Sequence, residues 1–338
     1  MLRRTHIAAA ALLAAAACAH AGPPAGKALP EVAWPAAPAA PRLRLGAVLP
    51  PPDAPAPKRS LWQRVVDAVV GADPAEEDDR RLVRPFGVAA SEDGAVFVAD
   101  PDLPGVLRVG PEGGLEPVAC RDRAWSAPMA VAVGGGGELW VADGGAAEVV
   151  VVPPDHRCRA IGAGQLERPT GVALAAGRVV VADPPRHQLV VFSTDGALIA
   201  RWGSEGEGDD QLHFPTAVAT AGEGVLAVDA LNFRVVRVSP DGHGAPALGA
   251  RGDEGGALAR PKCVAVDPSG RVYVSDAQRD LVLVYDARGA FEYAAGASGA
   301  EPGAFQHPAG VAVLRDRLYV ADSHNARIQV FQILGGSS

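Results

Sequence analysis

The sequence lacks the common catalytic motifs and is poor in aromatic residues. Its 338 residues include 5% aromatic residues, two methionines and four cysteines. It contains no His-Glu-x-x-His zinc motif, no Gly-x-Ser-x-Gly elbow, no P-loop and no haem-attachment Cys-x-x-Cys-His. The run Asp100–Gly105 fails the spacing of a calcium loop. These absences favour a non-enzymatic role without a cofactor.

Lysine is scarce as well, and acidic residues outnumber basic ones. Lysine occurs only at Lys27, Lys58 and Lys262, and the formal net charge is −8 with a pI near 5.5. A nucleic-acid partner needs a basic surface that neutralises phosphates. The composition therefore argues against nucleic acid as a partner.

The N-terminus predicts export. Arg3 and Arg4 precede an apolar run over residues 7–17 that is too short to span a bilayer comfortably, which is typical of a secretory signal peptide, residues 1–17. Two maturation sites compete. Residues 19–21, Ala-His-Ala, fit the small-x-small cleavage pattern. Residues 13–18 resemble a bacterial lipobox with alanine three positions before Cys18, where leucine is usual. The favoured hypothesis is a lipidated Cys18 that anchors a monomer in the outer membrane, on the periplasmic side.

Several short segments precede the main body of the chain. Residues 60–70 place apolar side chains at helical spacing behind a serine N-cap and predict a short helix. Residues 42–49, between Pro41 and Pro50, form the only strand-like run before the first repeat. The predicted order is an Ala/Pro-rich linker at 18–41, a strand at 42–49, a linker with the helix at 50–83, the body at 84–334 and a tail at 335–338.

The body consists of six copies of one pattern. Each copy begins at a proline, continues with a short apolar run and a turn, and has a second apolar run that ends in aspartate. The copies begin at Pro85, Pro128, Pro169, Pro215, Pro261 and Pro308, at intervals of 43, 41, 46, 46 and 47 residues. A period of this size with only β-type runs is typical of a radial or stacked repeat fold.

One copy shows how the fold is built. The third copy contains strand-like runs at 171–174, 178–183, 188–193 and 198–203, with glycine-containing turns between them. Short links make consecutive strands antiparallel, and no helical segment permits a parallel sheet. Neighbouring sheets must pack face to face, which predicts an all-β, six-bladed β-propeller with four antiparallel strands in each blade.

The last copy is one strand short, because few residues follow Phe331. An open edge would leave backbone groups unpaired. We expect residues 42–49 to supply the missing strand and close the ring, which brings the predicted total to twenty-four strands.

The repeat resembles the NHL repeat. The resemblance rests on Pro308-x-Gly-Val-Ala-Val, Tyr319-Val-Ala-Asp322 and Asn325-x-Arg327-Ile-x-Val-Phe331, and it extends over residues 84–334. The whole order of segments is similar to secreted bacterial NHL lipoproteins. This resemblance implies a six-bladed propeller that binds or scaffolds, and it adds the alternative of an amidating-lyase-like enzyme, whose histidine pattern is not visible here.

The repeated polar residues suggest two sets. An aspartate before a turn readily accepts backbone amides, so the first set is expected to be structural, with Asn325 and Arg327 completing the turns. This set is Asp100, Asp143, Asp183, Asp229, Asp276 and Asp322. The second set precedes the blade prolines and is expected to rim the axial opening and attract an anionic ligand. Its basic members are Arg84, Arg168, Arg260 and His307.

The function expected from these features is an exported, lipid-anchored scaffold that binds an envelope protein or a small ligand. The alternative is a propeller hydrolase or lyase with a metal at the axial channel. The histidines at 156, 187, 213, 243 and 324 occupy non-equivalent or turn positions and favour surface roles over metal ligation.

The cysteines beyond residue 18 are odd in number. Cys263 replaces the usual glycine of an inner strand and is expected to be a small buried hydrophobe. Cys120 and Cys158 fall in the outer regions of adjacent blades, where radial splay disfavours a disulfide. Whether they pair stays open.

Overall fold

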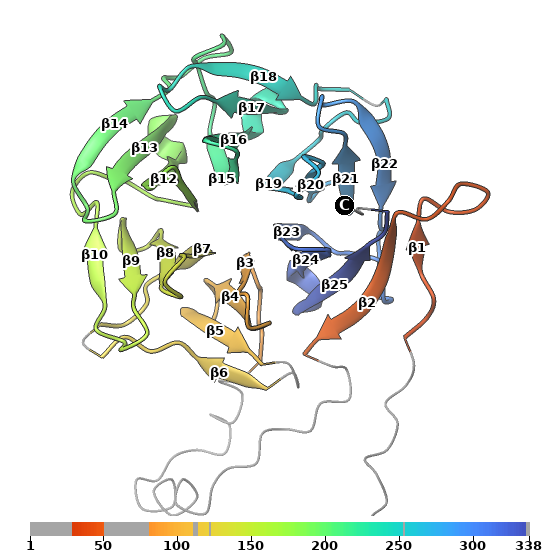
Figure 1. Ribbon diagram of the computed structural model, residues 1–338, viewed down its shortest axis with the longest axis horizontal. Helices are drawn as coiled ribbons and strands as arrows, with labels where there is room; N and C mark the ends of the chain where they lie inside the picture. Colours follow the sequence, from red (N-terminus) through yellow and green to blue (C-terminus); the bar gives the residue numbers. More distant parts are fainter. Residues whose placement is uncertain (1–28, 51–80, 111–113, 122, 253, 336–338) are drawn as a thin grey trace, which may run out of the picture.

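The computed structural model describes residues 29–50, 81–110, 114–121, 123–252 and 254–335. These residues form a ring of six antiparallel β-sheets whose first strands surround a common axis (Figure 1). The predicted six-bladed propeller is therefore confirmed. The signal peptide, Cys18 and the predicted helix at 60–70 lie outside the described residues.

Blades one to three each contain four strands in sequential order from the axis outward. Blade one comprises β3 (Gly87–Ala90), β4 (Val96–Asp100), β5 (Gly105–Val109) and β6 (Leu115–Pro117). Blade two comprises β7 (Pro128–Val133), β8 (Leu139–Asp143), β9 (Glu148–Val152) and β10 (Arg159–Ile161). Blade three comprises β11 (Gly171–Ala175), β12 (Arg178–Asp183), β13 (Gln188–Ser193) and β14 (Leu198–Trp202), with the 3-10 turn η2 (Pro184–Arg186) after β12.

Blades four and five repeat this order, and blade six ends differently. Blade four comprises β15 (Pro215–Ala221), β16 (Gly224–Asp229), η3 (Ala230–Asn232), β17 (Arg234–Val238) and β18 (Gly244–Leu248). Blade five comprises β19 (Pro261–Val266), β20 (Val272–Asp276), β21 (Leu281–Tyr285) and β22 (Phe291–Ala295). Blade six comprises β23 (Pro308–Leu314), β24 (Arg317–Asp322), η4 (Ser323–Asn325), β25 (Arg327–Ile333), β2 (Leu43–Leu49) and β1 (Ala33–Trp34).

The N-terminal strand closes the ring as predicted. β2 pairs antiparallel with β25, from Leu43 opposite Ile333 to Leu49 opposite Ile328. The sequence does not predict β1, a two-residue strand inside the proposed linker at 18–41. β1 pairs with β2, and Trp34 packs edge-on against Phe331 with ring centroids 5.7 Å apart. Blade six therefore has five strands. The contact between the Trp34 indole and the Phe331 ring holds the proline-rich segment against β2.

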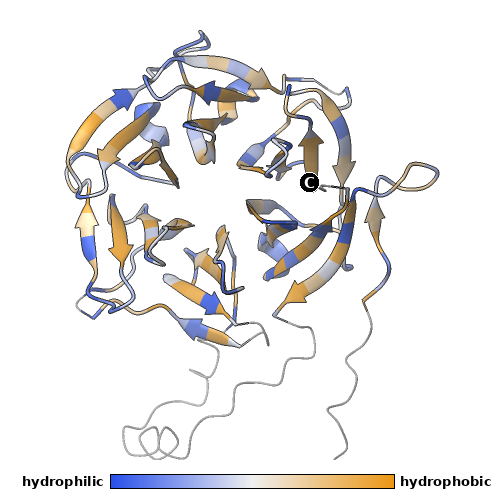
Figure 2. Ribbon diagram, viewed as in Figure 1, coloured by the Kyte–Doolittle hydropathy of each residue, from blue (hydrophilic) through white to orange (hydrophobic). Residues whose placement is uncertain are grey.

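The hydrophobic core lies between blades. One cluster joins Trp140 and Val151 of blade two to Val179 and Phe192 of blade three, and equivalent clusters occupy the other seams. The strand colours show this apolar character in every blade (Figure 2). At the axis the inner strands approach so closely that a Cβ on Gly171 would lie 2.8 Å from the Cα of Ala217. Glycine is therefore required at position 171, where the inner strand of blade three touches that of blade four.

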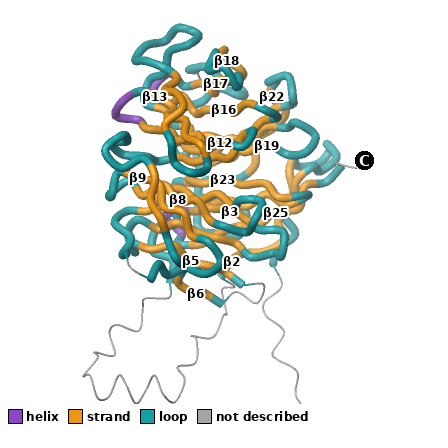
Figure 3. Tube along the Cα trace, turned by 60° about the vertical axis from the view of Figure 1, so that its left-hand side comes forward, coloured by secondary structure: helices purple, strands orange, loops and turns teal. Residues whose placement is uncertain are grey.

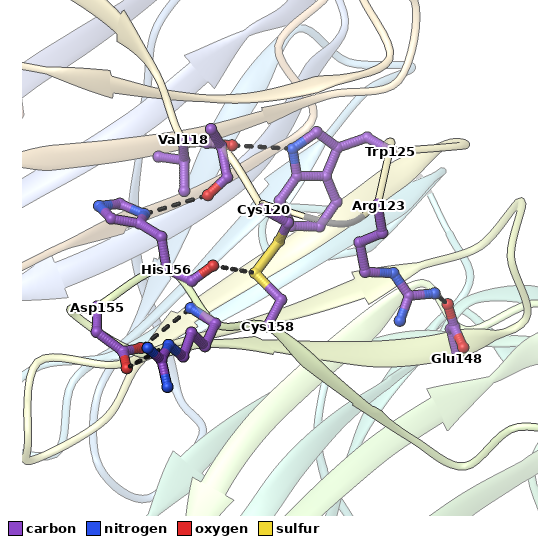
Figure 4. The surroundings of a disulfide bond; sticks show 10 residues. Val118, Cys120, Arg123, Trp125, Glu148, Asp155, His156 and Cys158 are labelled. Atoms are coloured by element: carbon purple, nitrogen blue, oxygen red, sulfur yellow. Dashed lines mark hydrogen bonds and ion pairs between the residues drawn. A yellow bond between two sulfur atoms is a disulfide. The ribbon is translucent and has the colours of Figure 1, made fainter.

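Cys120 and Cys158 form a disulfide with their Cα atoms 5.5 Å apart (Figure 4). The expected splay does not separate them, because neither residue belongs to a strand. Cys120 lies on the connection that leaves β6, and Cys158 lies in the loop before β10. Trp125 donates from Nε1 to the Val118 carbonyl beside the bridge, at 3.0 Å. The bridge joins blade one to blade two. Among the described residues the free thiol is Cys263, and burial raises its pKa.

Among the described residues no helix has the length and apolar character needed to cross a membrane.

Candidate functional site

The loops of the propeller form two faces (Figure 3). One, here called the entry face, carries the residues before the blade prolines, the turns between second and third strands, and the connections between blades. The opposite face carries the two other hairpin turns of each blade. Both sets of polar residues singled out in the sequence belong to the entry face.

The six repeated aspartates are buried, with 0 to 1% of their surface exposed. Asp276 is representative. It accepts hydrogen bonds from the backbone N–H groups of Ala259 and Arg260 at 2.6 and 3.0 Å, and of Gln278 and Arg279 at 3.1 and 3.2 Å. Asp100 and Asp143 make the same four bonds in their blades. Four donors saturate a carboxylate, so these groups organise the backbone and are not free to bind a ligand.

Blades four and six use a variant of this arrangement. Asp229 accepts from the His213 backbone N–H and from the side chains of Asn232 and Arg234. Arg234 also donates to the carbonyl oxygens of Gly208 and Gln211 at 2.8 and 3.0 Å. In blade six, Asp322, Asn325 and Arg327 repeat these contacts. The Asn-x-Arg pair therefore ties the preceding inter-blade connection to the buried aspartate.

This variant frees one backbone N–H at the start of each of these blades. Phe214 and His307 have φ values of 62° and 51°, a conformation that is uncommon for bulky residues. Their N–H groups donate to the preceding blade, to His187 Nδ1 at 3.2 Å and to Asp280 Oδ1 at 2.8 Å. Positive φ thus accompanies a hydrogen bond across the seam.

The predicted rim residues lie on the entry face and are exposed, but their environments differ. Arg84 forms an ion pair with Asp102 at 2.5 Å. His307 stacks on His324 with ring centroids 4.2 Å apart. The guanidinium groups of Arg168 and Arg260 have no hydrogen bond or ion pair within the part of the chain that the structure describes. These two side chains are the rim cations available to a ligand.

Sequence reasoning missed Lys262. It follows Pro261 as the second residue of blade five, where other blades carry uncharged residues. Thr216 donates from Oγ1 to its carbonyl at 3.1 Å, which places it at the inner ring. Burial, together with nearby Arg260, lowers the pKa of Lys262. The sequence did carry a signal for this residue: one of only three lysines in the chain occupies a position that is uncharged in the other five repeats.

Two histidines that the sequence assigned to separate surface positions meet. The His187 and His213 rings lie 5.4 Å apart, and a nitrogen of each and a carboxylate oxygen of Glu205 all lie within 4.8 Å of one another. Their non-equivalent positions in the sequence gave no signal of this contact. His187 is the C-cap residue that follows η2 of blade three, and His213 lies before the first strand of blade four. The two residues are therefore distant in the sequence but meet at the seam between the blades.

A pocket of about 220 Å³ lies between blades four and five, lined by residues that include Arg237, Leu248 and Arg288. It includes a β21–β22 turn of the opposite face and shares no residue with the rim.

The comparisons with known proteins agree with this geometry. The model of the NHL repeat matches residues 305–331, which contain His307, Asp322, Asn325 and Arg327. The chain carries an NHL repeat. The matched NHL repeat spans β23 to β25, the part of blade six in which the Asn-x-Arg pair holds the preceding connection. No curated protein matches the sequence.

Solved structures show the same fold at low sequence identity. A Bacteroides thetaiotaomicron protein of unknown function aligns with 75% of this chain and 70% of its own, at 15% identity and a TM-score of 0.63. An auxiliary nutrient binding protein from the same organism aligns over 74% and 69%, at 10% identity and 0.60. Virginiamycin B lyase from Staphylococcus aureus aligns over 76% and 97%, at 11% identity and 0.58. The NHL repeat and these likenesses establish a propeller.

Proposed function

We propose that this protein is an exported, lipid-anchored binding scaffold of the cell envelope, and that an anionic protein partner or small ligand docks on its entry face. The observation that carries the proposal is the trio of Arg168, Arg260 and Lys262. The two guanidinium groups are exposed and unpaired among the described residues, and the ammonium lies close to Arg260. Arg260 and Lys262 are like charges held near each other without a counter-ion among the described residues, and together with Arg168 on the same face they favour an anionic ligand.

The scaffold role also agrees with the architecture. Loops on a rigid framework can vary without loss of the fold, and binding residues are concentrated there. The fold shared with a nutrient-binding protein supports a binding role. This likeness does not identify the ligand of the present protein. The alternative of a metal-dependent hydrolase or lyase at the axis has less support. Within the described ranges, the group of metal-ligating side chains lies in a seam, not on the inner strands.

Export is supported by the disulfide between Cys120 and Cys158. Such bridges form and persist in oxidising compartments such as the bacterial periplasm. The anchor is Cys18, the first residue of the mature chain in this proposal. Mass spectrometry of the mature N-terminus tests it, because a lipidated Cys18 is expected and an unmodified chain that begins at Gly22 contradicts it.

Substitution of the three rim arginines tests the binding face. The R84S/R168S/R260S variant is compared with the wild type and with the control variant R157S/R315S/R317S, which removes exposed arginines from hairpin turns of the opposite face, outside the pocket. Each protein is used to capture partners from solubilised envelopes, and captured partners are quantified. The amount of partner captured by the rim variant is expected to be at least tenfold lower than the amount captured by the wild type or the control. Equal capture by all three proteins contradicts a role for the rim.

A further inference from the structure

We propose that the seam between blades three and four binds a divalent transition-metal ion of the zinc class through His187, Glu205 and His213. One ligand atom from each of these residues lies within 4.8 Å of the other two. Imidazole and carboxylate are zinc ligands, and two histidines with one glutamate form a three-ligand set that leaves a coordination position open. This site is separate from the arginine rim and goes beyond the scaffold function.

The repeat architecture explains why these side chains converge. Glu205, Arg251 and Ser298 occupy equivalent positions in three successive connections, where each forms an isolated parallel bridge with Leu212, Leu258 or Phe305. In the next two seams the side chain at this position contacts the residue equivalent to His187. Arg251 lies over the Phe233 ring at 5.1 Å, and Ser298 Oγ donates to Asp280 Oδ2 at 2.7 Å. The same geometry directs Glu205 toward His187.

The seam between blades three and four differs because two of its three polar side chains, Glu205 and His213, are unused in the described part of the chain. Within the residues that the structure describes, neither the Glu205 carboxylate nor the His213 ring has a hydrogen bond or an ion pair. In the next two seams the equivalent side chains, Arg251 and Ser298, have protein partners. A carboxylate facing two imidazoles and bonded to neither is the arrangement that a cation completes.

The backbone holds the three residues in place. The His213 N–H donates to buried Asp229, and its carbonyl accepts from the Leu231 N–H at 3.1 Å. His187 has its N–H bonded to the Pro184 carbonyl at 3.0 Å. Asn232 donates to the Gly206 carbonyl at 2.8 Å and so fixes the loop beside Glu205. Rigid support of this kind lowers the cost of assembling a metal site.

Zinc binding requires a small contraction of the site. Tetrahedral zinc with nitrogen and oxygen ligands at about 2.0 to 2.2 Å places ligand atoms about 3.3 Å apart. Glu205 is exposed, and its side chain can rotate toward the histidines. Water or an oxygen atom of an anionic ligand would take the fourth position.

Metal binding has a consequence for the rim. His187 Nδ1 accepts a hydrogen bond from the Phe214 N–H at 3.2 Å. An ion at Nδ1 replaces this donor, and an ion at Nε2 shifts the ring proton to Nδ1, where it opposes the donor. Either mode releases the N–H group of Phe214, the entry residue of blade four.

The test is titration of the full chain with zinc chloride, followed by calorimetry, and with cobalt(II), followed by visible absorption. The ligand variants are H187N, E205Q and H213Q, with asparagine at residue 187 because it tolerates the positive φ there. The control is H307N/H324Q, which alters the stacked histidine pair on the same face. Circular dichroism and thermal unfolding verify that each variant is folded.

We expect one zinc ion per chain in the wild type and the control, and affinity at least tenfold weaker in each histidine variant. The amide hydrogen of Phe214 is expected to exchange faster with zinc than without it, and this change should disappear in H213Q. Zinc binding that is equal in all variants, or absent from the wild type, overturns the proposal. Either result leaves the capture experiment on the arginine rim unaffected, so the two proposals fail separately.

Discussion

At the scale of single residues, the buried aspartates do most to shape the entry face. Each lies at the end of a second strand and collects N–H groups from the start of its own blade. The repetition of this aspartate in the sequence predicted a structural role at the turns. The backbone N–H groups that each carboxylate accepts explain that role. The identity of the donors differs between blades, and this difference places Phe214 and His307 at positive φ.

Replacement of Asp276 by asparagine is predicted to lower the free energy of unfolding by about 2 to 4 kcal/mol. The amide NH₂ cannot accept the four N–H groups that the carboxylate oxygens now receive. Urea denaturation measures the change. The control is D241N, which alters an exposed aspartate in the β17–β18 turn. Equal stability of the two variants would show that the buried carboxylate is dispensable.

Gly171 sets how closely two inner strands approach. The G171A variant is expected to lose about 1 to 3 kcal/mol of stability, because the new methyl group meets the backbone of Ala217. G135A is the matched control, since nothing lies within 4 Å of its Cβ position. Thermal unfolding distinguishes the two variants. A G171A protein as stable as G135A would contradict the close contact at the axis.

At the scale of elements, the strands of the repeats follow the apolar runs of the sequence closely. The runs predicted at 178–183 and 188–193 are β12 and β13, with the same bounds. The predicted closing strand at 42–49 is β2, one residue shorter. β1 was not predicted because two residues in a proline-rich segment have no periodicity. Its strand character depends on the edge of β2 and on the surface of Phe331, which the sequence does not place nearby.

The closing strand is attached by its apolar side chains and by charges. Leu43 is fully buried in the core of blade six, and Arg42 forms an ion pair with Glu292 of blade five. The L43A variant is predicted to lose about 2 to 5 kcal/mol in the free energy of unfolding, measured by urea denaturation. R44A is the control, because Arg44 alternates to the exposed side of β2. If L43A and R44A unfold at the same urea concentration, β2 does not carry the closure.

At the scale of the whole molecule, the ring depends on contacts at every seam. The disulfide covalently joins blade one to blade two, and β2 joins the two ends of the chain. The cysteine positions raised the question of pairing. Only the path of the connection after β6 answers it, because this path moves Cys120 out of the splayed strands.

The free energy of unfolding of the double variant C120S/C158S is predicted to be about 3 to 4 kcal/mol lower than that of the oxidised protein. The bridge closes a loop with a sequence separation of 38 residues, and opening it increases the entropy of the unfolded chain. Denaturation of the wild type with and without reductant provides the measurement. C263S is the control, because Cys263 is a free thiol. A reduced wild type as stable as the oxidised protein would contradict this contribution.

The amino-acid sequence by itself determined the number of blades, the strands within the repeats and the closing strand, because these depend on local periodicity and on the spacing of turns. The tertiary structure alone decided which side chains meet across a seam. His187 and His213 approach each other because blade three ends where blade four begins. Among the residues that the structure places, Arg84 is paired while Arg168 and Arg260 are not. Contacts of this kind depend on how rigid blades pack side by side, and no local pattern in the chain encodes that packing.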